Sequence, residues 1–219
     1  MKNLLSFVKL DFMTIKAYMT IKNLIIIILI SMWLSYTNTS IMTVIVVMMM
    51  FAFTYSTYPF MVGEKNGIDA LYSTLPITRK NVVVGRYIFI LSIDISALLI
   101  SCSLSCLIQT VLRRELDIKE HIMSALLILA AYILCQLIQA PIYFKVGYSK
   151  AKFIGLLPII GFYAIVLSFN FLFKNQVTSL MEIITANQGL MTVLLVVLIA
   201  VLMCLSYKLS MRFYKKRNF

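Results

Sequence analysis

The sequence predicts an all-α polytopic membrane protein, with six transmembrane helices, an N-terminal interfacial helix and a short cytoplasmic helix. Of its 219 residues, 62% are apolar and only 13% are charged, whereas soluble domains have about 45–50% and about 25%. Six apolar stretches approach or exceed the roughly 20 residues that cross a bilayer. They contain few prolines, and helices satisfy their own backbone hydrogen bonds in lipid. We therefore expect helices rather than a barrel, forming one domain over residues 1–219.

The first expected element is an amphipathic helix over residues 2–19. Its apolar residues recur at helical spacing: Leu4, Leu5, Val8, Phe12 and Ile15. Its charged residues are expected elsewhere on the helix surface: Lys2, Lys9, Asp11 and Lys16. A helix of this kind lies in the membrane interface. The segment is not typical of a cleavable signal peptide, because no small-residue cleavage site follows a short apolar core.

The six spans follow in order, at residues 22–36, 41–60, 84–109, 122–144, 153–173 and 190–207. The first span is short and is followed by a polar turn at 37–40. In the fifth span, Gly155, Pro158 and Gly161 predict a kink. Residues 174–189 have the apolar spacing of an amphipathic helix at the outer surface.

The positive charge predicts the orientation of these spans. The net charge is +12, and all but four of the 20 lysines and arginines fall on one side of the expected spans. The other side holds Arg113, Arg114, Lys119 and Lys174. Because cytoplasmic loops are enriched in lysine and arginine, both termini are expected in the cytoplasm. The charge is explained by topology and by anionic lipid head groups, so nucleic acid is not an expected partner.

The most polar cytoplasmic connection is the loop over residues 63–81. An apolar helical face is expected there, at i, i+3, i+4 and i+7: Ile68, Leu71, Tyr72 and Leu75. Asn66 can cap this helix, Pro76 ends it, and Thr78 can cap the span that follows. The apolar face can lie on lipid or dock into a groove on a soluble partner. Periodicity alone does not decide between the two.

This loop also resembles a family signature. It has Glu64, Gly67, Leu71, Leu75, Pro76, Thr78 and Arg79 at the spacing E-x-x-G-x-x-x-L-x-x-x-L-P-x-[ST]-R. That pattern is similar to small bacterial permeases of the type-2 ATP-binding-cassette (ABC-2) exporter family. In that family the loop is the coupling helix that contacts a separate ATPase. The resemblance therefore implies the following ATPase contacts: Glu64, Asn66, Gly67, Leu71, Tyr72, Leu75 and Arg79.

The resemblance also implies partners and a cargo. It implies two copies of a cytoplasmic ATPase, a second permease copy or paralogue, and a multi-pass place in the bacterial cell membrane among its lipids. No G-x-x-x-x-G-K-[ST] loop occurs in the sequence, so no cofactor is expected on this chain, and ATP and Mg²⁺ belong to the partner. By similarity to phenol-soluble modulin exporter permeases, the expected cargo is an amphipathic peptide or an antimicrobial compound.

Polar residues inside the spans are candidates for a substrate path. Asp94 lies well inside the third span, and a charge at the bilayer centre costs about 2.5–3.5 kcal/mol on insertion scales, so its carboxyl should face protein. Ser101 and Ser105 share its helical face. Gln136 and Gln139 form a polar stripe on the fourth span with Tyr132 and Tyr143. Each set can line a path or serve helix packing.

Two other function classes are weighed against export. A membrane scaffold or immunity protein would have the same spans without an ATPase partner. An intramembrane enzyme would need catalytic residues that the sequence lacks, because Asp94 has no second intramembrane carboxylate and the single histidine, His121, is expected at a loop edge. Cys102 and Cys106 stand at i, i+4, but we interpret them as small buried hydrophobes. We expect no catalytic residue and no metal site.

Overall fold

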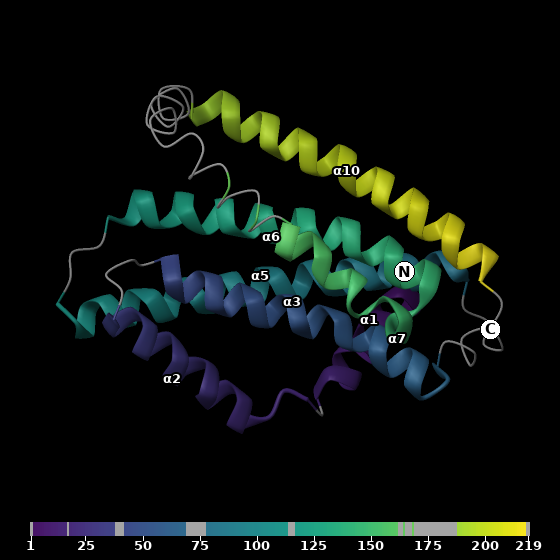
Figure 1. The fold of residues 1–219 in the computed structure, drawn as a ribbon, viewed down its shortest axis with the longest axis horizontal. Helices are drawn as coiled ribbons and strands as arrows, with labels where there is room; N and C mark the ends of the chain where they lie inside the picture. Colours follow the sequence, from purple (N-terminus) through teal and green to yellow (C-terminus); the bar gives the residue numbers. More distant parts are fainter. Residues whose placement is uncertain are drawn as a thin grey trace.

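A computed structural model describes residues 2–16, 18–37, 42–68, 78–113, 117–161, 164, 168 and 188–217. No strand occurs among them, which confirms the all-α prediction. The elements are α1 (Lys2–Lys16), α2 (Ile21–Thr37), α3 (Met42–Lys65), α5 (Arg79–Val111), α6 (Ile118–Val146), α7 (Tyr148–Ala151), the 3₁₀ turn η1 (Ile154–Leu156) and α10 (Gln188–Lys216) (Figure 1).

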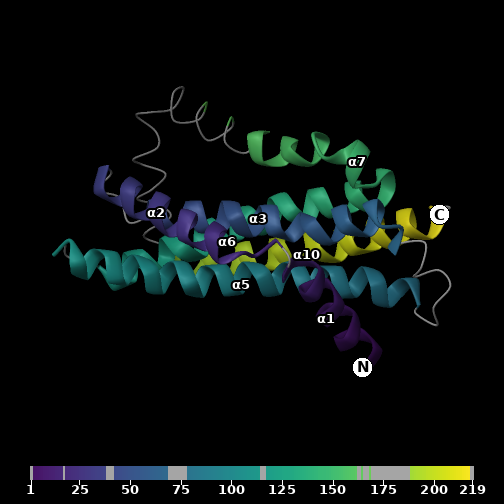
Figure 2. The ribbon, with the colours of Figure 1, turned by 90° about the horizontal axis from the view of Figure 1, so that it is seen from below.

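Four of these helices are long and apolar enough to cross a membrane: α3, α5, α6 and α10. They contain 24, 33, 29 and 29 residues, or about 36 to 50 Å at 1.5 Å per residue, against a hydrocarbon core of about 30 Å. Two views show them running side by side along the long axis (Figures 1 and 2). The structure therefore supports the second, third, fourth and sixth predicted spans.

The first predicted span, 22–36, corresponds to α2. This helix has 17 residues, or about 26 Å, and alone it is too short to be counted as a span. Together with α1 it forms a pair bent by 77°, which is either a fifth, broken span or a re-entrant loop. Four to five spans are thus supported within the described residues, and six stays a prediction.

The fifth predicted span, 153–173, lies mostly outside the described residues. Its described beginning is irregular, with α7, η1 and a short helical run at 157–161, in keeping with the expected kink.

The packing of α6 on α10 is parallel, because Ser206 contacts Leu137 and Phe213 contacts Lys145 farther along both helices. The chain therefore returns from one end of the bundle to the other between Val146 and Gln188.

The start of α5 follows the expected capping. Thr78 is extended (φ −72°, ψ 141°), and its hydroxyl accepts a hydrogen bond from the backbone N–H of Asn81 at 3.3 Å. A side-chain acceptor at this position satisfies a backbone donor that has no partner within the helix. The prediction that Thr78 caps the third span is confirmed.

The burial of the long helices differs greatly. In the most apolar window of α3, 61% of residues are buried within the chain, whereas in α10 the figure is 6%. The N-terminal half of α10 is apolar and exposed: Leu190, Val193, Leu194, Val197, Leu198 and Val201. In a membrane this face meets lipid or another protein.

The N-terminal helix differs from the prediction. It is helical as expected, but Asp11 belongs to its buried face together with Phe7, Val8 and Ile15. The Asp11 carboxylate lies 3.4 Å from Nε of Arg86 on α5, which explains how a charge can be buried there. The placement of Asp11 on the helix surface was wrong.

Candidate functional site: a buried polar seam and the basic end of the bundle

Asp94 lies in the middle of α5 with no exposed surface. Its Oδ1 accepts a hydrogen bond from Nε2 of Gln136 on α6 at 3.0 Å. The same amide nitrogen lies 3.5 Å from Oγ of Ser56 on α3. The expectation that the Asp94 carboxyl faces protein is confirmed, and the pair joins three helices.

A second polar contact lies farther along the same two helices. Ser105 Oγ is 2.9 Å from Nε2 of His121, and both side chains are buried. Because α5 and α6 run antiparallel, the pairs 94–136 and 105–121 belong to one interface, about 16 Å apart along α5. His121 lies in the first turn of α6, which begins at Ile118, so it stands near the loop edge as expected, with its side chain buried.

We call this interface the polar seam. It consists of Asp94, Ser101, Ser105 and Gln109 of α5, His121 and Gln136 of α6, and Ser56 of α3, all buried. The stripe of Asp94, Ser101 and Ser105 was predicted from spacing. Gln109 continues the same spacing at i+15 and could have been found by extending it.

Gln139 belongs to a different site. Its Nε2 donates to the Tyr143 hydroxyl at 2.8 Å and to the carbonyl of Gly155 at 3.0 Å. It lines an open pocket of about 240 Å³ between α3, α6 and the α7–η1 segment, with Thr57, Tyr148 and Lys152. The structure therefore brings Asp94 and Gln136 together, but it separates Gln139 from them.

A larger groove lies between α6 and α10. Its volume is about 840 Å³. Its lining is mostly apolar: Leu134, Leu137, Ile138, Pro141, Ile142, Val146, Ile154, Leu202, Leu205, Ser206, Leu209 and Phe213, with one cation, Lys145. The Lys145 ammonium lies 5.3 Å from the ring centre of Phe213. The groove offers apolar surface along its length and a positive charge toward the end of α6.

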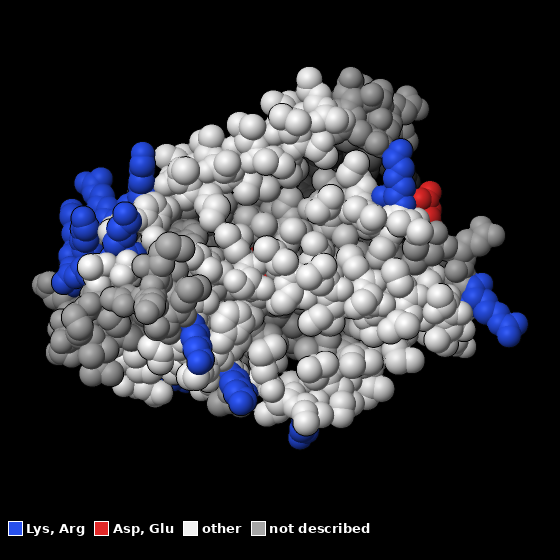
Figure 3. Space-filling model, turned by 180° about the vertical axis from the view of Figure 1, so that it is seen from behind, with Lys and Arg blue, Asp and Glu red and all other residues white. Residues whose placement is uncertain are grey.

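The predicted coupling residues that the structure describes, Glu64, Asn66, Gly67 and Arg79, lie at the end of the bundle where α3, α6 and α10 finish and α5 begins. Basic side chains gather there, including Lys65, Arg79, Lys145, Lys215 and Lys216 (Figure 3). We call it the basic end. The far end carries both signs of charge, including Asp117 and Lys119.

At the basic end, Glu64 binds another part of this chain. Its Oε2 accepts a hydrogen bond from the backbone N–H of Ser149 at 3.1 Å, at the start of α7. Between the two lies Gly147, at φ +85° and ψ 165°, a conformation that is essentially restricted to glycine. A Cβ on Gly147 would lie 2.6 Å from Glu64 Oε2 and 2.9 Å from a guanidinium nitrogen of Arg217. The end of α3, the α6–α7 turn and the end of α10 therefore meet at Gly147.

Arg79 makes a similar contact from the other side of the loop. Its guanidinium donates to the carbonyl of Lys215 at 2.6 Å, in the last turn of α10, where helix carbonyls lack partners within the helix.

Asn66 and Gly67 form the turn that ends α3, and Gly67 has φ +65°. Leu71, Tyr72 and Leu75, with the rest of 69–77, lie outside the described residues. Their role as ATPase contacts stays a prediction.

No cluster of three or more histidine, cysteine, aspartate or glutamate side chains able to hold a metal occurs in the described part of the chain. Cys102 and Cys106 are free thiols on α5, and because Cys102 is partly exposed and Cys106 is exposed, the interpretation of both as buried was wrong.

A family model described as ABC-2 family transporter protein matches residues 6–215. The chain belongs to the ABC-2 transporter family. This permease is thus a multi-pass membrane protein and a transport subunit, of a kind that works with a separate ABC ATPase. No curated protein and no solved structure matches the chain.

The resemblance pointed to the loop of the permease but not to its partners within the chain. Gly147, Ser149, Lys215 and Arg217 were missed. A glycine directly after a long apolar helix was the available signal for Gly147, since such a position often requires positive φ. The contacts of Ser149, Lys215 and Arg217 depend on how the helices pack.

Proposed function

We propose that this permease exports an amphipathic peptide or an antimicrobial compound across the bacterial cell membrane, using ATP and Mg²⁺ bound by two copies of a cytoplasmic ATPase. The basic end would face the cytoplasm and hold both termini. This agrees with the rule that lysine and arginine stay on the cytoplasmic side.

The observation that carries the proposal is the way both ends of the loop 63–81 are held. Glu64, before the loop, binds the backbone of Ser149 at the start of α7. Arg79, after the loop, binds the end of α10. A partner that pulls on this loop would thereby act on the ends of α3, α5, α6 and α10 together, as transmission of an ATPase movement requires.

A second copy of the permease, or a paralogue, is part of the proposal. One chain has few buried residues in α10, and the exposed N-terminal half of this helix is apolar. Such a surface is compatible with pairing of two permeases, with lipids covering what remains.

The cargo class is supported by the groove between α6 and α10. A volume of about 840 Å³ lies within the usual range for ligand pockets, about 300–1,000 Å³. The apolar lining suits the apolar face of an amphipathic molecule, and Lys145 suits a carboxylate on it. Similarity to phenol-soluble modulin exporters is part of this proposal.

The experiment is an ATPase pull-down with permease variants at equal membrane level. Leu71→Asp with Leu75→Asp places two charges on the apolar face of the loop, and losing a buried anchor costs about 2 kcal/mol or more. We expect loss of ATPase binding, or hydrolysis that no longer responds to cargo. Ser73→Asp, on the opposite face by the same helical spacing, is the matched control and should bind as the wild type does.

Wild-type binding by the double variant would remove the loop from the coupling interface. A wild-type chain that never captures an ATPase, yet protects cells from a membrane-active peptide, would favour the alternative of a scaffold or immunity protein without transport.

A further inference from the structure

We propose that Asp94 and Gln136 form a proton-binding site, in which the Asp94 carboxyl is a neutral acid that donates its Oδ2 hydrogen to Oε1 of Gln136. The ligand is a single proton. The proposal is independent of the cargo and of the ATPase partner.

The hydrogen bonding between Asp94 and Gln136 lacks one donor. Gln136 Nε2 donates to Asp94 Oδ1 at 3.0 Å. Asp94 Oδ2 and Gln136 Oε1 are both buried and have no hydrogen-bond partner. An ionised carboxylate and an amide oxygen are both acceptors only, so neither can serve the other. One proton on Oδ2 supplies the missing donor and satisfies both atoms.

The surroundings of Asp94 offer no counter-charge within the described residues. The one buried cation on α5 is Arg86, eight residues earlier and about 12 Å away along the helix, and it is paired with Asp11. Gln136 of α6 donates to the Asp94 carboxyl, and Ser56 of α3 contacts the Gln136 amide nitrogen. Ionisation without a partner is costly at this depth in a membrane.

Titratable groups on neighbouring turns are bound elsewhere. The Tyr132 hydroxyl points to the carbonyl of Val46 at 3.4 Å, and the Cys135 thiol to that of Pro158 at 3.7 Å. Tyr87 bonds to Ser206 and Ser210 of α10. None of them supplies a donor to Asp94 Oδ2.

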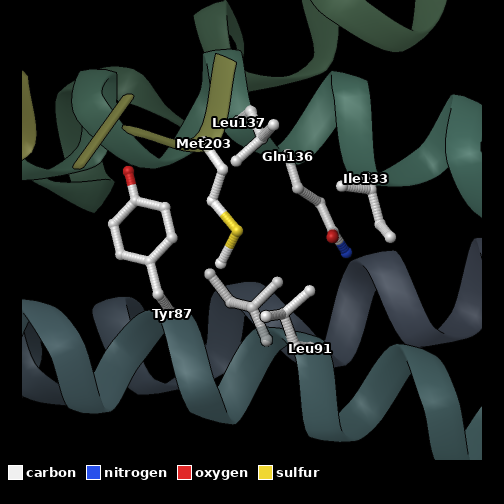
Figure 4. Close-up of a pocket in the computed structure, with 7 residues that line it drawn as sticks. Tyr87, Leu91, Ile133, Gln136, Leu137 and Met203 are labelled. Atoms are coloured by element: carbon white, nitrogen blue, oxygen red, sulfur yellow. The ribbon is translucent and has the colours of Figure 1, made fainter. Parts of the chain in front are cut away.

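A water molecule could also bridge two acceptors, but the space beside the pair does not favour it. The cavity that Gln136 lines has a volume of about 10 Å³, at the lower limit for one water. Its other walls are Tyr87, Ile90, Leu91, Ile133, Leu137 and Met203, and Asp94 is not among them (Figure 4). A water there would meet mostly carbon atoms.

Protonation of Asp94 is linked to the contact between α5 and α6. With the proton, the pair closes the contact between α5 and α6 without a net charge. Without it, two buried acceptors are left without a donor. Separation of α5 from α6 that admits water would let the carboxyl release its proton, so opening and proton release are linked.

Infrared spectroscopy of the purified permease in phosphatidylethanolamine–phosphatidylglycerol nanodiscs tests the proposal directly. At neutral pH we expect the carbonyl band of a protonated carboxylic acid, absent in Asp94→Asn. The band should shift in Gln136→Leu, which lacks the acceptor. Asp117→Asn removes an exposed carboxyl at the far end of the bundle and should leave the band unchanged.

Thermal unfolding of two Asp94 variants provides a second test. Asp94→Asn replaces the acid hydrogen by an amide hydrogen, so it should unfold at the wild-type temperature, whereas Asp94→Leu should unfold lower. Absence of the acid band at neutral pH overturns the proposal. So does an Asp94→Asn protein as unstable as Asp94→Leu, because an ionised carboxylate held by water or a cation would then be the native state.

Discussion

The carboxylate of Asp11 lies 3.4 Å from Nε of Arg86, and both side chains are buried, with 1% and 3% of their surface exposed. The rings of Phe7 and Phe60 flank the guanidinium, with their centres 5.7 and 5.0 Å from its central carbon. This contact fixes α1 to α5 near the basic end. The N-terminal helix is therefore part of the packed bundle.

The first prediction is that Asp11→Ala strongly destabilises the permease. Removing one member of a buried ion pair leaves the other charge without compensation and costs about 3–5 kcal/mol. Thermal or denaturant unfolding in detergent measures the loss, with Lys9→Ala, exposed on the same helix, as the control. Asp11→Ala combined with Arg86→Met should recover part of it. Equal stability of the Asp11→Ala and Lys9→Ala proteins would contradict the structural role of the pair.

Sequence reasoning predicted the elements of this fold better than their contacts. Apolar length placed four spans within a few residues of the ends of α3, α5 and α6 and of the start of α10, because burial in lipid constrains composition directly. Thr78 was predicted as a cap because capping is local. Asp11 and Arg86 are 75 positions apart, so their pairing depends on how α1 packs on α5, which periodicity does not encode.

In the candidate site, too, local spacing was predicted from the sequence, whereas contacts between helices were not. The spacing of Asp94, Ser101 and Ser105 predicted one buried stripe. The Asp94 carboxyl was expected to face protein because a charge in the hydrocarbon of a membrane is costly. Gln136 and Gln139 lie three residues apart on α6, so their side chains point only about 60° apart, yet they meet different neighbours. Only the packing of α6 against α5 on one side and η1 on the other separates their roles.

The second prediction concerns the contact between α5 and α10. Ser206 donates to the carbonyl of Leu137 at 2.5 Å, so the Tyr87 hydroxyl, 2.6 Å from Ser206 Oγ, donates to Ser206. Tyr87→Phe removes this link and should lower stability by about 0.6–1.7 kcal/mol, the range measured for hydrogen bonds between membrane helices. Tyr207→Phe, on the adjacent α10 surface, is the control. An unchanged unfolding midpoint for Tyr87→Phe would contradict the prediction.

The third prediction concerns orientation. In a cysteine-free background, cysteines at Leu116 and Thr178 should react with a membrane-impermeant thiol reagent added outside cells. Cysteines at Asn66 and Ser149 should react only after the membrane is opened, because both lie at the basic end. The reverse pattern would show that the basic end faces outward and would contradict the charge argument.

The last prediction is that Gly147→Ala disrupts the basic end of the bundle. Alanine at φ +85° and ψ 165° is strained by about 1–3 kcal/mol, and its Cβ would lie 2.6 Å from Glu64 Oε2. The carboxylate would have to leave the Ser149 N–H, which frees the end of α3 from α7. We expect lower stability and weaker ATPase binding. Gly189→Ala, with no atom within 4 Å of the added Cβ, should change neither.

A double-mutant cycle separates the two causes. If displacement of Glu64 contributes, the effects of Gly147→Ala and Glu64→Ala on unfolding will be less than additive, as neighbouring sites that share a contact usually are. If backbone strain alone is responsible, the two effects will add. If Gly147→Ala has wild-type stability, neither the positive φ nor the close approach of Glu64 contributes to the stability of the permease. The contact of α3, α6 and α10 at this glycine would then not be what holds the basic end together.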